Sequence, residues 1–296
     1  MSSFKLALHS VSYSGAWRNQ AYLSLEEFLR KAASFGYKGV ELVGKRPHLS
    51  PFDLREKDVL ALAEQMRELS LECACIAGYN DFSTDSGFAP MLEMQLIYVD
   101  KLAQFAKMLG CPRLRLFTGY ETGAPYWPLW NTCVAAIREC CKRAAEYGIE
   151  IGIQNHHDIA VDAPSLAEFI AEVGEPNCGA MFDAWAPMAQ GLDLSAGVKM
   201  LSGKIIFTTA ADYRRVKRFN YNPNLVNYAP GADLLKAVPM GQGFVDYKTF
   251  FAALHEIGYD GYVSYEMCSE LEGGGSIANL DRCAKSFVRY MKDIIT

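Results

Sequence analysis

The sequence predicts a single (β/α)8 TIM barrel spanning residues 1–296. Three observations support this fold class. Short β-rich segments alternate about eight times with longer amphipathic segments, several predicted helices end at a glycine, and no change in composition marks a linker. The chain is 50% hydrophobic over 296 residues, which is enough for one large core. Eight repeats favour a closed parallel barrel over an open sheet.

The predicted strands are short apolar runs, and the predicted helices place apolar residues on one side. The strands cover residues 4–9, 39–43, 71–77, 113–117, 149–154, 178–183, 204–209 and 261–267. The helices cover residues 24–35, 53–69, 91–109, 130–147, 165–173, 246–257 and 277–295, and the helix after Asp183 is only weakly indicated. Ser24 and Glu27 form a capping box that starts the first helix.

Glycines mark the ends of several helices. Gly36, Gly110, Gly148 and Gly258 follow the last amphipathic turn, where a left-handed residue commonly closes a helix. The longest interruption runs from 210 to 242 and is rich in Asn, Pro and Tyr. We expect it to be a functional loop after the seventh strand, because loops of this length in compact domains are usually functional.

Composition excludes several functional classes. The net charge is −5 and basic residues are scattered apart from a short run at 214–218, so binding to nucleic acid is not expected. The nine cysteines form no CxxC pair or zinc-type grouping, which predicts reduced thiols. No apolar run is long enough to span a membrane, and residues 1–8 lack a signal-peptide pattern. We therefore expect a cytoplasmic protein without a membrane partner.

Polar residues close nearly every predicted strand. Active sites of (β/α)8 barrels lie at the carboxyl ends of the strands, so these residues are expected to converge. Glu41 and Glu266 are the strongest candidates, because each interrupts an apolar or aromatic strand in which an unpaired carboxylate would be costly. The strand-end residues are His9, Glu41, Tyr79, Asn80, Arg115, Gln154, His156, Asp183, Thr208, Thr209 and Glu266.

Three segments resemble the xylose isomerase-like TIM barrels of the sugar-phosphate isomerase and epimerase group. Residues 241–247, continuing through 254–261 to Glu266, resemble that family's glycine-x-glycine segment, seventh helix and eighth strand. Residues 154–156 resemble the Glu-Asn-His that closes strand five, and 182–183 the end of strand six. The resemblance implies this fold over the whole chain and a small sugar-like substrate.

The resemblance also implies a divalent metal held by Glu, Asp, His and Glu on strands five to eight. Asp183 and Glu266 match this pattern, whereas Gln154 replaces the first Glu and the strand-seven segment around Thr209 contains no histidine. Two carboxylates with neutral oxygens favour Mg²⁺ or Mn²⁺ over Zn²⁺. His156 would point to the same side as Gln154 if the strand continues, and could replace the missing imidazole. The alternative is that the metal has been lost.

The family chemistry implies proton abstraction beside a carbonyl of an open-chain sugar. Because Gln154 cannot accept a proton, we expect Glu266 to be the main base, with His156 as a second catalytic group. An isomerase or epimerase is the leading prediction. A lyase that dehydrates a keto-sugar or keto-inositol is one alternative, and a metal-free sugar-binding barrel without catalysis is the other.

Further residues are predicted to contact the substrate. Alternation along 113–117 turns Arg115 toward the barrel interior or its mouth, where it needs an anionic partner such as Glu41, Asp183 or a substrate carboxylate or phosphate. Arg215 matches a position of a substrate-binding arginine in relatives. The complete substrate-binding prediction is His9, Glu41, Arg115, Trp185, Thr209 and Arg215. The sequence leaves open whether the chain forms a homo-oligomer.

Overall fold

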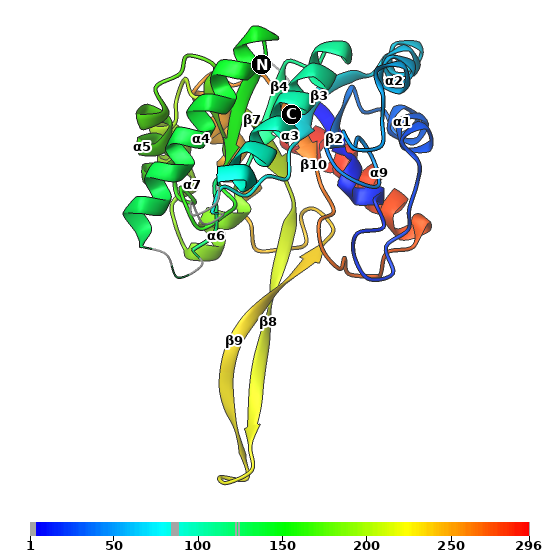
Figure 1. The fold of residues 1–296 in the computed structure, drawn as a ribbon. Coiled ribbons are helices and arrows are strands. Elements are labelled where there is room, and N and C mark those ends of the chain that lie inside the picture. Colours follow the sequence, from blue (N-terminus) through cyan, green and yellow to red (C-terminus); the bar gives the residue numbers. More distant parts are fainter. Residues whose placement is uncertain (1–3, 84–88, 122, 124, 296) are drawn as a thin grey trace.

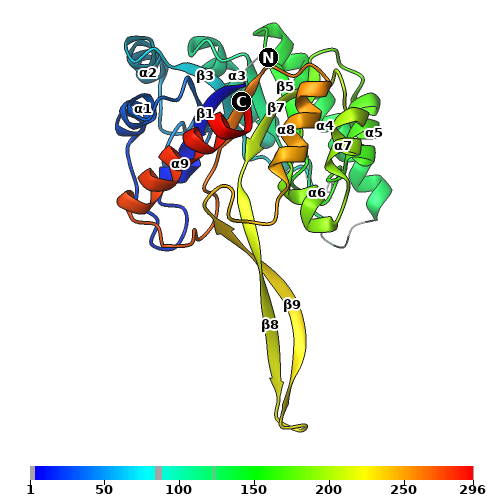
Figure 2. The same ribbon diagram turned by 180° about the vertical axis from the view of Figure 1, so that it is seen from behind.

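The fold is a closed barrel of parallel strands with helices on its outside (Figures 1 and 2), seen in a computed structural model that describes residues 4–83, 89–121, 123 and 125–295. The order around the barrel is β1, β10, β7, β6, β5, β4, β3, β2. Every neighbouring pair in the barrel is parallel. The predicted (β/α)8 TIM barrel is therefore confirmed.

All eight predicted barrel strands are present, with ends that shift by up to two residues. The barrel strands are β1 (Lys5–His9), β2 (Gly39–Val43), β3 (Glu72–Ala77), β4 (Arg113–Leu116), β5 (Glu150–Gln154), β6 (Cys178–Met181), β7 (Ile205–Ala210) and β10 (Tyr262–Tyr265). The helices are α1 (Leu25–Ser34), α2 (Glu56–Glu68), α3 (Ala89–Met108), α4 (Tyr126–Glu146), α5 (Ala163–Val173), α6 (Trp185–Gln190), α7 (Leu194–Met200), α8 (Tyr247–Glu256) and α9 (Ile277–Ile295), with a 3-10 turn η1 (Ser10–Tyr13).

Local signals in the sequence set the helix ends. The Ser24 side chain accepts from the Glu27 backbone N–H and the Glu27 side chain accepts from the Ser24 backbone, so the predicted capping box is confirmed. Gly36, Gly110 and Gly148 have φ values of 88°, 64° and 75°, the left-handed conformation that glycine adopts without strain. None of the helices in the described ranges is long and apolar enough to cross a bilayer.

A small apolar cluster fills the barrel interior below the polar residues. It consists of Ala7, Ala74, Cys75, Met181, Phe207 and Tyr262, all buried. Because side chains two residues apart on a strand point the same way, Ala7 and Phe207 lie under His9 and Thr209, respectively. The barrel is therefore packed shut at one end, and its polar residues gather at the carboxyl end.

The segment 210–242 is where the sequence-based prediction was wrong. It forms an antiparallel hairpin of β8 (Asp212–Asn222) and β9 (Asn227–Val238), not a loop. The hairpin projects far from the barrel on the side where the barrel strands end (Figures 1 and 2). From residue 214 to 236 every side chain is exposed or half-exposed. We call residues 214–236 the arm.

The glycine-x-glycine segment anchors the root of the arm. Both carboxylate oxygens of Asp212 accept backbone N–H groups, Oδ2 from Gly241 and Gly243 at 2.9 and 2.8 Å, and Oδ1 from Tyr213 and Val245. A Cβ atom on Gly243 would lie 1.9 Å from Asp212 Oδ1. Glycine is required at 243 because the chain wraps closely around this carboxylate.

Candidate active site

A cavity of about 440 Å³ lies at the carboxyl ends of the barrel strands. Its wall is largely aromatic, with Trp17, Tyr79, Phe117, Tyr120, Trp185 and Tyr213 among the lining residues. Polar and charged groups on the wall include Lys45, Arg115, Gln154, His156, His157 and Glu266. Concave sites of this kind, apolar with a few polar groups, are typical of small-molecule binding.

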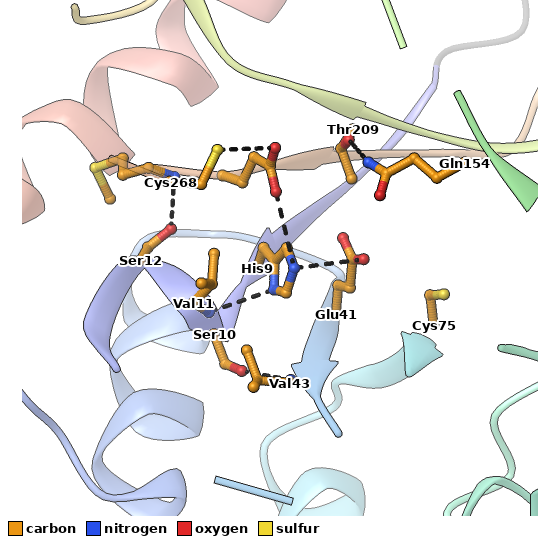
Figure 3. A network of polar contacts seen from close by, with 12 residues as sticks. His9, Ser10, Val11, Ser12, Glu41, Val43, Cys75, Gln154, Thr209 and Cys268 are labelled. Atoms are coloured by element: carbon orange, nitrogen blue, oxygen red, sulfur yellow. Dashed lines mark hydrogen bonds and ion pairs between the residues drawn. The ribbon is translucent and has the colours of Figure 1, made fainter. Parts of the chain in front are cut away.

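His9 lies between two buried carboxyl groups (Figure 3). Its Nε2 atom is 3.5 Å from Glu41 Oε1 and 3.8 Å from Glu266 Oε2. Glu41 and His9 are 0% and 1% exposed, and Glu266 is 7% exposed and forms part of the cavity wall. The three residues come from β2, the end of β1 and the residue after β10, which are neighbours in the barrel.

The protonation state of His9 follows from its contacts. Burial, and next the positive charge of Arg115, hold the pKa of His9 well below its usual value, so the ring is neutral. Nδ1 accepts a hydrogen bond from the Val11 backbone N–H at 3.3 Å. The proton must therefore sit on Nε2, which faces both carboxyl groups.

The two glutamates have strongly raised pKa values. Burial raises the pKa of Glu41 to about 8, against the opposing effect of Arg115. Burial, and next the charge of Asp183, raises the pKa of Glu266 to about 7. Glu266 Oε1 also accepts a weak hydrogen bond from the Cys268 thiol at 3.0 Å. Glu266 can therefore change its protonation state near neutral pH.

Asp183 is held by hydrogen-bond donors of the protein. Its Oδ2 atom accepts from Gln154 Nε2 at 2.5 Å and from the Thr209 hydroxyl at 2.6 Å, and its Oδ1 atom accepts from the Thr209 backbone N–H at 2.7 Å. The reversed Gln154 amide would bring two acceptor oxygens together, so the donor orientation is the stable one. Burial raises the pKa of Asp183, and the bonds from Thr209 and Gln154 oppose that rise.

His156 does not take the place that the sequence suggested. β5 ends at Gln154, and the chain turns so that the His156 backbone N–H donates to the Gln154 carbonyl at 2.8 Å. His156 does not follow the strand alternation, because β5 does not continue beyond Gln154. His156 lines the cavity and packs edge-on to Trp185, and burial lowers its pKa to about 3.

These residues do not fit the divalent metal that the resemblance implies. Both Asp183 oxygens already accept protein donors, and Gln154 presents its N–H group to Asp183. Within the described ranges, no three His, Cys, Asp or Glu side chains are grouped so as to hold an ion. The predicted ligand set of Gln154, Asp183, Glu266 and His156 is therefore not assembled, because Gln154 and Thr209 occupy the carboxylate that a cation would need.

Arg115 is buried as expected from strand alternation. It is 3% exposed, lies on β4 and forms part of the cavity wall. Its guanidinium carbon is 3.9 Å from the ring centre of Phe117 and 4.8 Å from that of Tyr79. Among the described residues, Arg115 forms no ion pair at 4.0 Å or less. The predicted pairing with Glu41 or Asp183 is therefore absent.

The remaining predictions divide between cavity and surface. Trp185, at the start of α6, lines the cavity. Thr209 lies beneath the cavity, where its hydroxyl donates to Asp183. Arg215 is exposed on β8, donates to the Ala189 carbonyl at 2.8 Å and is not among the cavity-lining residues described. The Arg215 guanidinium therefore lies against α6, and its contact with substrate stays a prediction.

The cavity residues that the sequence reasoning missed include two that contact each other. Tyr213 at the arm root and Cys268 after β10 both line the cavity, and the Tyr213 hydroxyl is 3.2 Å from the Cys268 sulfur. Cys268 follows Glu266 by two residues, so the search for side chains at the strand ends could have included it. Tyr213 had no such signal, because its position depends on the unrecognised hairpin.

Residues 29–286 match the sequence profile of the family described as xylose isomerase-like TIM barrel. The chain belongs to this family. The match covers seven of the eight barrel strands, from β2 to β10, so the resemblance deduced from residues 154–156, 182–183 and 241–266 is confirmed.

Relatives of this xylose isomerase-like barrel include enzymes of two kinds. Fructoselysine 3-epimerase from Escherichia coli O157:H7 is 22% identical, with 83% of this chain and 86% of the relative covered. Inosose dehydratase from Glaesserella parasuis serovar 5 is 21% identical, with 92% and 90% covered. These names agree with the prediction of a sugar isomerase- or epimerase-like enzyme, with a lyase as the alternative.

Solved structures share the fold of this family member over nearly their whole length. D-allulose 3-epimerase from Methylomonas sp., in complex with D-allulose, aligns with a TM-score of 0.75 at 18% identity and covers 99% of this chain and 98% of its own. The probable 3-DHS dehydratase from Bacillus anthracis aligns with a TM-score of 0.74 at 20% identity and covers 99% of both chains. At these identities the comparison supports the architecture of the barrel.

Proposed function

We propose that the protein is an enzyme that removes a proton from the carbon next to a carbonyl of a sugar-like substrate, with Glu266 as the base. The carrying observation is the carboxyl of Glu266 on the cavity wall, with burial raising its pKa to about 7. A general base acts best when its pKa is near the working pH, because a large fraction is ionised and its basicity is high. A glutamate of ordinary pKa would be a much weaker base.

His9 and Glu41 support this base. The Nε2–H of neutral His9 faces the Glu266 carboxyl at 3.8 Å and restricts its orientation. Glu41, with a pKa raised to about 8, lies on the other side of the same N–H and stays largely protonated at neutral pH. We assign His9 and Glu41 to positioning Glu266 and holding its pKa near 7, and no contact with substrate is assigned to them.

Buried groups on the cavity wall would bind the substrate oxygens. Trp185 Nε1, His157 Nδ1 and Gln154 Oε1 are buried and have no hydrogen-bond partner in the protein. Such atoms are costly to leave unsatisfied, and a polyhydroxylated substrate or water supplies their partners. The likeness to a D-allulose epimerase and a fructoselysine epimerase supports a carbonyl sugar derivative as this substrate.

The carboxylate of Asp183 is already taken up by donors of the protein. Mg²⁺ or Mn²⁺ was expected from the resemblance, but the donors on Asp183 conflict with that ligand set. His156 remains on the cavity wall, and with its pKa lowered to about 3 it is a neutral hydrogen-bonding group. Glu266 is then the principal base, which suits a single-base isomerisation, or an epimerisation in which a second cavity group returns the proton.

A lyase is the second candidate. Removal of the same proton is also the first step of β-elimination of water from a keto-sugar or keto-inositol. The observation that favours it is the inosose dehydratase relative, which covers 92% of this chain. The third candidate, a sugar-binding barrel without catalysis, would use the same cavity and leave the raised pKa of Glu266 without a role.

A deuterium experiment separates the three candidates. The protein is incubated in D₂O with a panel of neutral and acidic keto-sugars and keto-inositols, followed by mass spectrometry. Deuterium in a product of unchanged composition indicates an isomerase or epimerase, and loss of water indicates a lyase. Absence of both with every compound would contradict the enzyme proposal and leave a binding protein.

A further inference from the structure

Arg115 carries a buried positive charge that has no carboxylate in direct contact among the described residues. Its side chain is 3% exposed, and its Nε and Nη1 atoms have no hydrogen-bond partner. No carboxylate oxygen in the described ranges lies within 4.0 Å of its guanidinium nitrogens. An unpaired buried charge is costly, so a group that stays buried and unpaired in the free protein indicates a missing anion.

Two aromatic rings fix the plane of the Arg115 guanidinium. Phe117 and Tyr79 stack on the guanidinium at 3.9 and 4.8 Å. Lys45 Nζ lies 3.8 Å from the centre of the same Tyr79 ring and belongs to the same cavity wall. Aromatic rings stabilise the faces of a guanidinium and leave its N–H edge for an anion. The cavity therefore has a cationic wall made by Arg115 and Lys45.

The acidic residues of the site already have other partners. Asp183 accepts from Thr209 and Gln154, and Glu266 accepts from Cys268. Glu41 lies against His9 and is largely protonated at neutral pH. Glu41 and Glu266 stabilise the charge of Arg115 only from beyond ion-pair distance, and neither pairs with its guanidinium at 4.0 Å or less.

We propose that Arg115, with Lys45, binds an anionic substituent of the substrate, a carboxylate or a phosphate. This inference rests on the proposed function, because it assigns the anion to the same sugar-like molecule. A guanidinium edge binds either group through two parallel hydrogen bonds. The substrate class is then a sugar acid or a sugar phosphate, distinct from the neutral sugars named for the epimerase complex.

The test measures binding without turnover. Thermal unfolding is followed during titration with D-fructose, D-fructuronate and D-fructose 6-phosphate, and with acetate and inorganic phosphate as simple anions at matched ionic strength. We expect a carboxylate or a phosphate to raise the Tm by about 3 °C at ten times its Kd, with the neutral sugar giving less. Comparison of the D-fructuronate and D-fructose 6-phosphate titrations shows whether the site binds a carboxylate or a phosphate.

Arg115→Met is the matched variant, because it keeps an unbranched apolar stem between the two rings. It should abolish the anion-dependent shift and retain cooperative unfolding, and Arg115→Lys should retain part of the shift. An equal shift in wild type and Arg115→Met, or no shift in wild type with any anion, would overturn the proposal. Anion binding without deuterium exchange would contradict only the proposed function.

A second inference comes from the arm and is independent of the cavity. At the arm root, Arg214 pairs with Glu272 and Arg215 donates to the Ala189 carbonyl. Residues 216–234 are exposed or half-exposed, and a two-stranded ribbon is marginally stable by itself. Large apolar side chains are nevertheless exposed along it, from 50 to 77% each: Phe219, Tyr221, Leu225, Val226, Tyr228 and Leu234. An exposed apolar surface on this scale indicates a partner.

The charge of the arm identifies the kind of partner. Residues 214–236 contain five Lys or Arg and one Asp, which gives +4, while the whole chain carries −5. The rest of the chain therefore carries −9, which complements the arm. We infer that the arm docks on the acidic body of a second copy of this chain, forming a two-fold dimer in which each arm contacts the other barrel. At 3.4 Å per residue the arm extends about 30 Å, enough to reach another barrel.

The mass in solution tests this inference. Sedimentation should give twice the 32.9 kDa chain mass, and added salt should weaken the dimer. Leu225→Asn with Val226→Asn should give the monomer mass, and Asn tolerates the φ of 49° at position 226. Leu60→Asn on α2, which is 54% exposed, serves as the control and should leave the mass of the dimer unchanged. A wild-type chain that sediments as a monomer would overturn the dimer inference. So would a Leu225→Asn, Val226→Asn variant that remains a dimer.

Discussion

The barrel and the arm use β-strands in opposite ways. β2 is buried at all five positions, and its stability comes from neighbours within the chain. β8 is exposed or half-exposed from Arg214 onward, so burial contributes little to its stability. Backbone pairing holds both regions together, and β8 pairs with β9 from Asp212↔Val238 to Asn222↔Asn227 with one register shift between Val216 and Arg218. Burial is therefore what separates them, in line with the chemistry proposed for the barrel mouth and the association proposed for the arm.

The two regions meet at the arm root. Tyr213 and Leu235 line the cavity although they belong to β8 and β9. Asp212, which fixes this root, is held by the glycine-x-glycine segment. The comparison can be tested by changes that affect only one region.

The largest expected effect is on the chemistry of the barrel mouth. Glu266→Gln should reduce deuterium exchange at the substrate carbon by about 10³-fold, because the amide cannot accept the proton. The sedimentation mass should not change. Exchange that persists at the wild-type rate would remove Glu266 from the role of base, and a change in mass would break the separation between mouth and arm.

A smaller change is expected in metal binding. Wild type should bind Mn²⁺ weakly, because Gln154 and Thr209 occupy the Asp183 carboxylate. Gln154→Glu with Thr209→His removes these donors and supplies two ligands, so Mn²⁺ affinity by calorimetry should rise about 100-fold or more. Gln154→Asn is a control without a new carboxylate. Tight Mn²⁺ binding by wild type, lost in Asp183→Asn, would show that the donor argument is wrong.

The pH dependence of exchange follows from Glu266. The base must be ionised, and burial raises its pKa to about 7, so the rate should increase with pH and level off above about 7. Below that pH the rate should fall about tenfold per pH unit. A profile that levels off near pH 4.5, the ordinary value for glutamate, would show that the free site does not hold Glu266 as described.

The smallest expected effect is on the junction of the two regions. Gly243→Ala would place a Cβ atom 1.9 Å from Asp212 Oδ1 and 2.4 Å from the Tyr213 carbonyl oxygen, so the backbone must shift. We expect the Tm to fall by about 5 °C and the arm root to become more sensitive to protease. Gly231→Ala is the control, since its nearest neighbour is the flexible Asn220 amide at 3.2 Å. Equal Tm values for both variants would contradict this anchor.

Much of the barrel could be predicted from local signals. The capping box at Ser24 and the glycines after α1, α3 and α4 are short-range features, and the structure retains them. The convergence of His9, Glu41, Arg115 and Glu266 followed from the rule that polar strand ends gather at one end of a barrel. The hairpin was missed because β8 and β9 bury neither face, so no alternation of apolar and polar residues distinguishes them from a polar loop.

By itself the sequence determined the order of strands and helices and the set of polar residues at the barrel mouth, because periodicity and capping act over a few residues. Only the tertiary structure decided the partners of those residues. It showed that Gln154 and Thr209 hydrogen-bond to Asp183, and that Arg115 stays unpaired beside Phe117. These outcomes depend on distances between side chains of different strands, which no local pattern contains.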